Sequence, residues 1–529
     1  MKNSIVLFKG RPFDPKYQEF NNFPYRAPLT LLSLASPLIQ EGFNVIVIDH
    51  RLDIDVALKK IESVLDDLLF IGVSVLTGFE IADGLHISEM LKKKDPTIPS
   101  IWGGWHVCCL PEETLEDPRV DIVVKNIGQN ILVNIAKRLQ NNINNFSDIP
   151  GVFTKNEKTC QQTFTDSKNI TSLQNIPLPA YELIDLEYLR KESTSLLSDD
   201  EYKGLKLTGS IDYVTSFGCS NRCSYCCNPK VYGSSWFDYP VEKVVQQIKW
   251  LYDEKGFNHF NFIDAEFTMR YKHLKLLLEK LISENIDICW SAQAAVSGIL
   301  NLQKHGLLPL VEKSGCYRLA IGAESGSERI LKYMNKKQTV NTIIQAANLL
   351  KDNNIPASFN CLTGLPVVET FDDIYKTFHM AFELKKISSE FSFPIAFYTP
   401  LPGSDMFEDS INSGFIAPQS LEEWGKYSTS YNSISEKIPW RNLKKEKLVK
   451  HFITFYLPLS VPGNITRGTV TYLKKHLKEH PLRWLIFIGH KLSLFRIKHS
   501  WFKIPFEYYL FNLYQRFCGL QYIPGGRQK

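Results

Sequence analysis

Strand-like apolar runs alternate with helical segments along most of the chain, and this alternation constrains the fold more than any other feature of the sequence. In the first stretch, strands are expected at 4–8, 44–49, 69–75, 100–104 and 121–125, with helices at 29–41, 55–66 and 79–93. Apolar strands separated by helices predict a parallel sheet that is covered on both faces. The expected N-terminal architecture is therefore α/β, a doubly wound, Rossmann-like sheet.

The alternation resumes near residue 207 and predicts a second parallel sheet. Strands are expected at 213–217, 259–264, 288–293, 317–324, 356–364 and 390–397. Helices are expected at 241–254, 271–285, 298–314, 327–334, 339–353 and 369–385. Six strand–helix units in sequence predict a partial (β/α)6, TIM-like barrel, in which chemistry gathers at the C-terminal ends of the strands.

These patterns divide the chain into four parts. We expect a Rossmann-like domain at 1–140, a linker at 141–206, the partial barrel at 207–430 and a mainly helical, basic and aromatic C-terminal domain at 431–529. The chain has 529 residues, 44% of them hydrophobic and 22% charged, which is enough for several globular cores.

Three cysteines, Cys219, Cys223 and Cys226, lie in the run TSFGCSNRCSYCCNP with the spacing C-x-x-x-C-x-x-C. A closed zinc site or iron–sulfur cluster usually has four protein ligands, so three thiolates on one loop predict a four-iron cluster with one open iron. A small chelating molecule can bind that iron and receive an electron. A zinc knuckle and unrelated buried thiols are the alternatives. Cys227 is expected to be a non-ligand, and no comparable spacing connects the remaining cysteines, which are Cys108, Cys109, Cys160, Cys289, Cys316, Cys361 and Cys518.

Small or polar residues follow the later strands of the first series, where open parallel sheets bind their ligands. Tight turns are the alternative explanation for the glycines, and a plain loop position is the alternative for the histidine. The candidate binding residues are Ser74, Thr77, Gly78, Gly103, Gly104, His106 and Gly128.

The cysteine loop, with the aromatic Tyr225 before its last ligand, resembles the signature of the radical S-adenosylmethionine (SAM) enzymes. Three N-terminal segments resemble, in their order, the cobalamin-binding domain that precedes many radical SAM domains: YRAPLTLLSLASPLIQEGFNVIVID, IGVSVLTGFE and PSIWGGWHVCCLPEETLEDPRVDIVV. The chain has no D-x-H-x-x-G motif, so the resemblance implies no histidine in place of the lower cobalt ligand. It does place Tyr225 among the cofactor-binding residues.

Two further motifs of the family indicate SAM contacts. FIDAEFT resembles a D-x-x-F-T variant, which implies that Asp264 and Glu266 accept hydrogen bonds from the SAM amino group. IGAESGSERIL matches a G-x-E-S-G segment, which implies that Glu324 and Ser325 lie near the ribose or methionine part, with helix capping as the alternative for the serine. SAQAAV lacks the arginine that many relatives place on the third strand, which leaves Gln293 as a candidate polar contact.

These resemblances imply a cobalamin-dependent radical SAM enzyme that uses a 4Fe–4S cluster, SAM and cobalamin. The expected activity is methyl transfer to an unactivated carbon of a small molecule, and lipophilic molecules are among the candidate substrates. The alternative activity is oxidative cyclisation without methyl transfer. A non-catalytic cobalamin sensor would share the N-terminal domain but has no use for the three-cysteine loop. The family also implies a reductase, flavodoxin or ferredoxin as electron donor. No protein residue is assigned a catalytic role, because the chemistry belongs to the cofactors.

The C-terminal part is strongly basic. Residues 440–529 hold 17 Lys and Arg against 3 Asp and Glu, whereas the rest of the chain holds 44 against 53. Cations interleaved with aromatic and aliphatic residues predict contact with an anionic membrane surface. A helical cap that packs on the barrel and leaves a solvated basic face is the alternative. An anionic substrate or nucleic acid would use the same charge, but the aliphatic runs favour lipid, and no nucleic-acid partner is expected.

The cellular compartment is expected to be the cytoplasm, with peripheral contact at the inner face of the membrane. The cysteine spacing is irregular for a disulfide framework, and the N-terminal run MKNSIVLFKG lacks a signal-peptide core. No stretch approaches the roughly 20 apolar residues of a membrane span.

Overall fold

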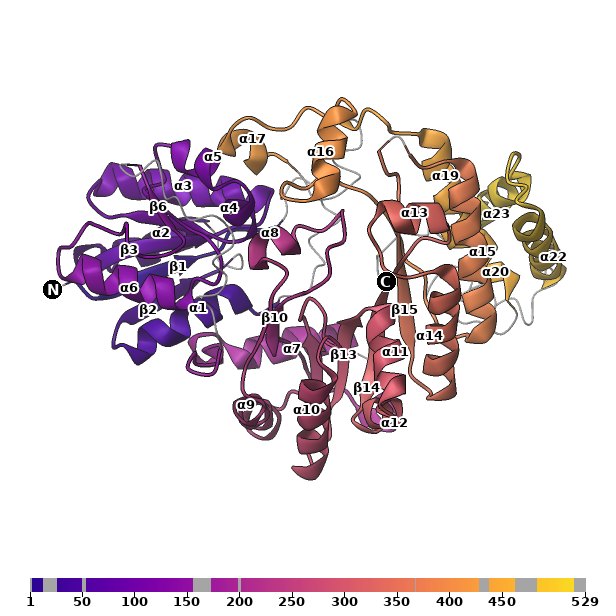
Figure 1. The fold of residues 1–529 in the computed structure, drawn as a ribbon, viewed down its shortest axis with the longest axis horizontal. Coiled ribbons are helices and arrows are strands. Elements are labelled where there is room, and N and C mark those ends of the chain that lie inside the picture. The colour runs from indigo at the N-terminus through magenta and orange to yellow at the C-terminus, as the bar shows by residue number, and fades with distance from the viewer. Residues whose placement is uncertain are drawn as a thin grey trace. The chain divides into compact units, whose positions relative to one another are not determined.

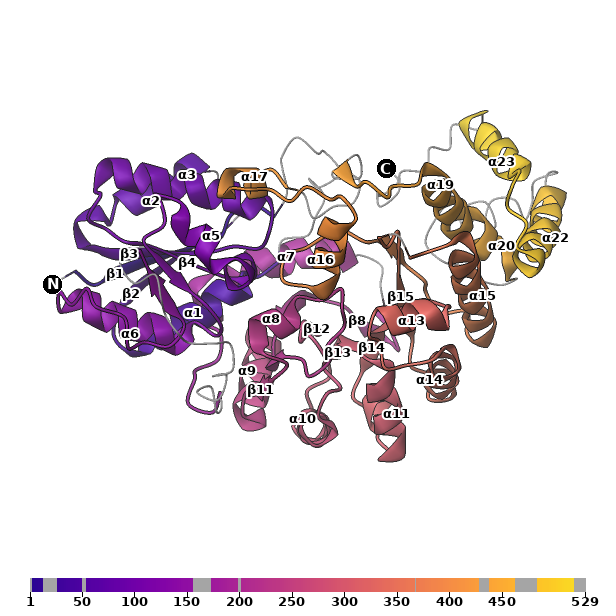
Figure 2. The same cartoon turned by 45° about the horizontal axis from the view of Figure 1, so that its top comes forward.

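The computed structural model describes residues 2–12, 26–49, 54–155, 173–197, 201–366, 368–427, 437–461 and 483–517 (Figures 1 and 2). Cys160, Cys518 and residues 462–482 of the basic tail lie outside this set. Two compact units make up the chain: Met1–Ser291 with Thr399–Ile438, and Ala292–Tyr398 with Pro439–Lys529.

The first unit begins with a six-stranded sheet in the order β2-β1-β3-β4-β5-β6. The pairings among the first five strands are parallel, as predicted, and only β6 pairs antiparallel, with β5. β6 belongs to the segment expected to be a linker, and its three residues are too few for a periodic signal. The strands are β1 (Ser4–Phe8), β2 (Asn44–Ile48), β3 (Leu68–Ser74), β4 (Ser100–Gly103), β5 (Ile122–Val124) and β6 (Val152–Thr154).

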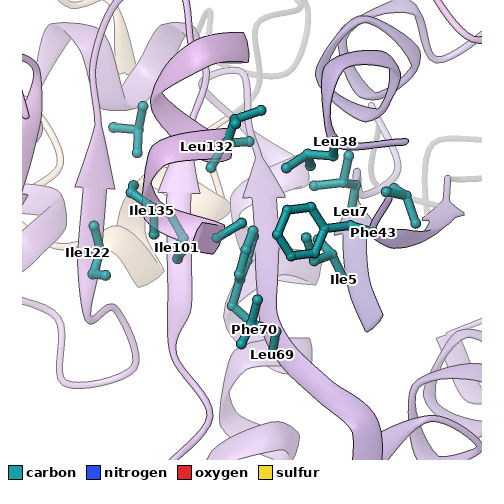
Figure 3. Packing of buried hydrophobic residues seen from close by; sticks show 14 of the residues in the cluster. Ile5, Leu7, Leu38, Phe43, Leu69, Phe70, Ile101, Ile122, Leu132 and Ile135 are labelled. Carbon is teal, nitrogen blue, oxygen red and sulfur yellow. The ribbon is translucent and has the colours of Figure 1, made fainter. Parts of the chain in front are cut away.

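Two helices, α1 (Leu29–Gln40) and α6 (Gln129–Gln140), pack on one face of this sheet (Figure 3). Side chains from both helices and from all six strands form one buried cluster there. Among them are Leu38, Leu132 and Ile135 of the helices and Ile5, Leu7, Phe70, Ile101 and Ile122 of the strands.

The longer helix α3 (Phe79–Lys94) covers the opposite face. The indole of Trp102 donates a hydrogen bond to Ser88 of this helix at 3.2 Å, and Gly84 lets the helix approach the same ring. Successive strand residues point to opposite faces, so Ile101 and Trp102 enter different layers. Burial on both faces is the reason that these strands read as continuous apolar runs.

The second sheet has the strand order β16-β15-β14-β13-β12-β9. Its registers are parallel between β9 and β12 and between β15 and both β14 and β16. This is the predicted partial barrel, and the predicted α/β fold class is confirmed. The strands are β9 (Ser210–Tyr213), β12 (His259–Phe262), β13 (Cys289–Ala294), β14 (Cys316–Glu324), β15 (Ala357–Thr363) and β16 (Ile395–Phe397).

The barrel helices follow the predicted order, with one correction. They are α9 (Val241–Asp253), α10 (Tyr271–Ser283), α13 (Glu328–Tyr333), α14 (Val340–Asp352) and α15 (Phe371–Ile387). The single helix expected at 298–314 is two helices, α11 (Val296–Lys304) and α12 (Leu308–Lys313). Pro309 lies in the first turn of α12, where a missing N–H is harmless, whereas inside one long helix it would remove a hydrogen bond.

The run YVTSF is also divided. Tyr213 ends β9, whereas β10 (Ser216–Gly218) pairs antiparallel with β11 (Trp236–Asp238) in a separate two-stranded ribbon. The cysteine loop therefore leaves from this ribbon and not directly from a barrel strand.

The described residues of the C-terminal part of the second unit are mainly helical. They form α19 (Leu443–His451), a π-helical turn (Phe452–Tyr456), α20 (Leu457–Ser460), α22 (Arg483–His499) and α23 (Phe506–Phe517). Helix α22 packs on both α15 and α20. None of the described helices combines the length and the apolar character that a membrane crossing needs.

Candidate cobalamin and cluster site

A cavity of about 300 Å³ lies at the carboxyl ends of the first sheet. One part of its wall comes from the ends of β1, β3, β4 and β5 and from the start of α1. The other part comes from residues after β9, in β10 and after β12. All of these residues belong to the first unit. The ligand-binding edge of the sheet and the strand that leads into the cysteine loop therefore line the same cavity.

Four of the seven candidate residues at the strand ends line this cavity: Ser74, Gly103, Gly104 and Gly128. At Gly104 φ is +101°, and a Cβ would lie 2.5 Å from the carbonyl oxygen of Val75, so this position requires glycine. A Cβ on Gly103 would meet only the carbonyl oxygen of Val124, at 3.5 Å. Gly103 is thus a cavity-lining position at which a side chain could be added without backbone strain.

The other three candidates, Thr77, Gly78 and His106, are not in the cavity wall. His106 Nδ1 lies 3.0 Å from Thr77 Oγ1, and the imidazole packs edge-on against Trp424 with ring centroids 5.3 Å apart. Its Nε2 is buried without a hydrogen-bond partner in the part of the chain that the structure describes. Burial lowers the pKa of His106 to about 3, so the ring is neutral. These contacts favour a packing role over cofactor contact.

The cysteine loop is a compact, half-buried turn. Cys226 N donates to the carbonyl oxygen of Cys223 at 3.0 Å, and Asn228 N, two residues further on, donates to Cys226 Sγ at 3.4 Å. Burial and, to a smaller extent, the neighbouring thiols raise the pKa of Cys226 to about 12. Thiolates in this loop therefore need a bound cation, which a metal cluster supplies.

Cys227 lies on a different side of the loop from its neighbour. It packs with Cys108, Cys109 and Val231, and its thiol is hydrogen-bonded to that of Cys109. This packing supports the expectation that Cys227 is a non-ligand. Among the described residues, no three His, Cys, Asp or Glu side chains converge on a single metal position. Cluster cysteines need not converge in this way, because each binds a different iron atom.

The Asp264 side chain is hydrogen-bonded to neighbouring residues of the protein. Its carboxylate accepts hydrogen bonds from Thr215 N at 3.1 Å, from Thr215 Oγ1 at 2.6 Å and from the hydroxyl of Ser216. It is 1% exposed, and burial raises its pKa. These bonds tie the end of β12 to the start of β10. They favour a role for Asp264 in positioning the loop over direct contact with the SAM amino group.

Glu266 and Tyr225 lie closer to the cysteines. Glu266 is buried, accepts from Thr268 N at 3.0 Å through Oε1, and is near enough to Cys219 to contribute to the raised pKa of that thiol, whose main cause is burial. Tyr225 is half-buried within the loop itself.

The remaining SAM candidates belong to the second unit. Glu324 has φ +64°, is 7% exposed and forms an ion pair with Lys336 at 3.2 Å. Ser325 Oγ accepts from Ser327 N at 3.1 Å, a local turn bond that precedes α13, whose N-cap residue Ser327 has no side-chain capping bond. Gln293 is exposed at the end of β13. Nothing in the sequence indicated that Lys336 pairs with Glu324, because it is one lysine of an ordinary polar turn.

Comparison with known proteins agrees with this geometry. A family model of the radical SAM superfamily matches residues 213–381, and a model of the B12 binding domain matches residues 26–136. The chain is a cobalamin-dependent radical SAM enzyme. Its cofactors are a 4Fe–4S cluster, SAM and cobalamin.

Two curated proteins illustrate the relatives of this radical SAM enzyme. It is 26% identical over 436 residues to the uncharacterised methyltransferase PH0819 of Pyrococcus horikoshii, a match that covers 81% of this chain and 88% of the relative. It is 25% identical over 396 residues to the anaerobic magnesium-protoporphyrin IX monomethyl ester cyclase of Rubrivivax gelatinosus, covering 72% of this chain and 66% of the cyclase.

Two solved structures share the fold of the radical SAM enzyme. The cobalamin-dependent radical enzyme OxsB, with aqua-cobalamin and SAM bound, aligns with a TM-score of 0.69 and 16% identity over 98% of this chain and 75% of its own. The methyltransferase TsrM of Kitasatospora setae, with cobalamin and a [4Fe–4S] cluster, aligns with a TM-score of 0.58 and 18% identity over 78% of this chain and 75% of its own.

The residues of the radical SAM enzyme fit these cofactors. The glycines at 103, 104 and 128 keep one edge of the cavity free of side chains, and the surrounding wall is mainly apolar, as a macrocycle requires. The three cysteines of the loop are half-buried and lack a disulfide, so their thiols are available as ligands.

A segment that follows the barrel strands, residues 399–427, connects the two halves of this site. Met406 N donates to the carbonyl oxygen of Ser224 in the cysteine loop at 2.8 Å. The indole of Trp424 donates to Glu113 of the cobalamin-binding domain at 2.6 Å and covers His106. The segment LPGSDMF (401–407) thus contacts the loop through a backbone amide, a role that its sequence did not reveal.

We expect Gly103→Leu to lower the affinity for cobalamin by at least about tenfold, because the new side chain would occupy the cavity. Titration of the purified protein with hydroxocobalamin, followed by absorbance, measures the affinity. Gly103→Ala adds one methyl group that has room and is the matched control, with at most a few-fold effect. Wild-type affinity in Gly103→Leu would contradict the assignment of this cavity.

Two adjacent cysteines test the ligand set. We expect Cys226→Ala to lose the 4Fe–4S absorbance and most of the bound iron after anaerobic reconstitution, because one of three ligands is missing. Cys227→Ala should keep both, since Cys227 packs with Cys109 instead. If the two variants held equal amounts of iron, the assignment of ligands in this loop would be wrong.

The neutral His106 predicts acid sensitivity. The unfolded chain binds a proton at this residue below pH 6.5, but the folded chain does so only near pH 3. The free energy of unfolding should therefore fall by up to about 1.4 kcal/mol per pH unit below pH 6.5 on account of this residue. His106→Gln should lose about 2 kcal/mol less than the wild type between pH 7.5 and pH 5.0 in urea unfolding. Other titrating groups cancel in this difference, and an identical pH dependence in both proteins would show that His106 is not held neutral.

Proposed function

We propose that this enzyme transfers a methyl group to an unactivated carbon of a small molecule. The observation that supports radical SAM chemistry beside cobalamin is the cavity shared by the carboxyl edge of the cobalamin-binding sheet and the strand that leads into the cysteine loop, and the choice of methyl transfer is supported by the methyltransferase relative. When bound, the cofactors supply radical generation from SAM at the cluster and methyl carriage by cobalamin. Both cofactors must reach the same substrate, and a cavity lined by both cofactor-binding regions would bring them close to it.

The protein residues in this proposal hold and orient the cofactors. Cys219, Cys223 and Cys226 hold the cluster, and the strand ends at Ser74, Gly103, Gly104 and Gly128 form the cobalamin surface. Asp264 anchors the strand before the cysteine loop through Thr215 and Ser216. Glu266, Tyr225, Gln293 and Glu324 remain the proposed SAM contacts.

An oxidative cyclase is the second candidate, because one of the relatives described above carries that activity. Both candidates use the same cofactors, so the geometry of the cavity favours neither. The methyltransferase is preferred because the relative matched over the larger share of both chains is a methyltransferase.

An external one-electron donor completes the proposal. Radical SAM enzymes need a reductant for the cluster, and a reductase, flavodoxin or ferredoxin could serve here. The substrate is proposed only as a class, a small organic molecule with an unactivated carbon.

The decisive experiment incubates the anaerobically reconstituted enzyme with reductant, a cell extract and SAM labelled in its methyl group. We expect the label in a small-molecule product, together with S-adenosylhomocysteine and 5'-deoxyadenosine in the same reaction. Product without label, formed with 5'-deoxyadenosine alone, would favour the cyclase. Failure of the reduced, cluster-loaded enzyme to cleave SAM in any extract would reject both and favour a sensor.

A further inference from the structure

Half of the exposed large hydrophobic side chains among the described residues lie in one short stretch of the C-terminal part. Nine of eighteen fall between residues 487 and 513, although this stretch is only a small part of the chain. Scattered exposed hydrophobic residues are normal, but a concentrated patch marks an interaction surface. The nine are Phe487, Ile488, Phe495, Trp501, Ile504, Phe506, Tyr509, Leu510 and Leu513.

The spacing places seven of these side chains on one face of a helix, and Trp501 and Ile504 lie in the connection between α22 and α23. On α22 the exposed positions 487, 488, 491, 495, 498 and 499 recur every three or four residues, and on α23 so do 506, 509, 510 and 513. The two helices follow one another at the same end of the second unit and are linked by the ion pair of Arg496 with Glu507. Phe495 and Trp501 are in ring contact at 6.2 Å, so the face of α22 continues into the turn toward α23.

Arg496 holds this arrangement together from the inside. It is fully buried, donates to both carboxylate oxygens of Glu507 on α23, and donates through Nη1 to the carbonyl oxygen of Trp501 at 2.8 Å. Its guanidinium also lies 4.5 Å from the centroid of the Trp501 ring. The apolar face is therefore part of a built substructure and is not the result of two loosely attached helices.

The same pairing removes the only negative side chain from this surface. Glu507 is the one acidic residue between 487 and 513, and it is 8% exposed. The exposed charges in this stretch are Lys491, Lys498 and Lys503. Lys491 lies over the ring of Phe487 at 5.5 Å, so cation and aromatic side chain share one site. An apolar face with only positive charges complements an anionic, partly apolar surface.

We propose that the exposed faces of α22 and α23 dock on an anionic lipid bilayer. The aromatic and aliphatic side chains enter the boundary between head groups and acyl chains, while the three lysines meet lipid phosphates. The interaction is peripheral and weakens at high salt, because exposed charges are screened. This proposal does not depend on methyl transfer.

The test is flotation of the full-length protein with vesicles of phosphatidylcholine and phosphatidylglycerol at low salt. We expect the wild type to float with these vesicles and to float poorly with phosphatidylcholine alone. Raising the salt to about 0.5 M should release the protein, because salt screens exposed charges. Lys491→Gln, Lys498→Gln and Lys503→Gln together should reduce binding by about 100-fold, from about 1 kcal/mol for each lysine.

A second variant tests the apolar contribution, and both variants have matched controls. Ile504→Asn, Leu510→Asn and Leu513→Asn together should reduce binding at least tenfold, whereas Ile416→Asn, which changes a side chain 86% exposed in the other unit, should not. Lys59→Gln, Lys60→Gln and Lys272→Gln together control for net charge. Thermal melting and cobalamin titration confirm that every variant is folded.

Two outcomes would overturn the proposal. Negligible flotation of the wild type at low salt is one. The other is a concentration-dependent dimer, seen by sedimentation, that the apolar triple variant abolishes while vesicle binding stays absent, because the face would then belong to a second copy of the chain. Neither outcome would affect the labelling experiment on methyl transfer.

Discussion

The buried carboxylate of Asp264 is the interaction on which the geometry of the site depends. It ends a barrel strand, yet its oxygens bind the backbone and side chain of Thr215 and the hydroxyl of Ser216, at the start of the strand that leads into the cysteine loop. A carboxylate this deeply buried is stable only with several donors. Satisfying it therefore fixes where β10 begins. From there Gly218 turns the chain with φ +85° into Cys219, and the same strand forms part of the cavity wall below the cobalamin-binding sheet.

The cobalamin-binding domain and the cysteine loop are joined a second time by residues that are distant in sequence. The segment 399–427 contacts the loop through Met406 and the cobalamin-binding domain through Trp424, and Glu422 forms an ion pair with Arg119. Gly425 packs directly on Ala82 of α3. After the barrel strands the chain therefore returns to the first unit, and its contacts there hold the cysteine loop and the cobalamin-binding domain together.

The basic C-terminal part combines features of two sequence-based alternatives. Its inner surface is a cap within the second unit: α22 packs on α15 and α20, and Phe378 stacks on Phe452 with ring centroids 3.7 Å apart. Its outer surface is not uniformly polar, as a simple cap would be, but exposes aromatic and aliphatic side chains beside lysines. The buried pair of Arg496 and Glu507 makes an inner cap and an exposed apolar surface compatible, since it connects the two helices without using their outer faces.

The sequence by itself predicted the fold class and the succession of most strands and helices, because apolar periodicity is a local property of the chain, and its resemblance to the radical SAM enzymes implied the family and its cofactors. The strand order of both sheets came only from the structure. Tertiary structure decided which polar residues could face a ligand. Ser74, Gly103, Gly104 and Gly128 line the cavity, but His106 is covered by Trp424 from more than 300 residues away, and Ser325 bonds to Ser327 and Thr377. Asp264, which the family motif places near SAM, accepts hydrogen bonds from Thr215 and Ser216. Only the folded chain reveals such partners, because burial makes each polar group find a donor or acceptor wherever packing supplies one.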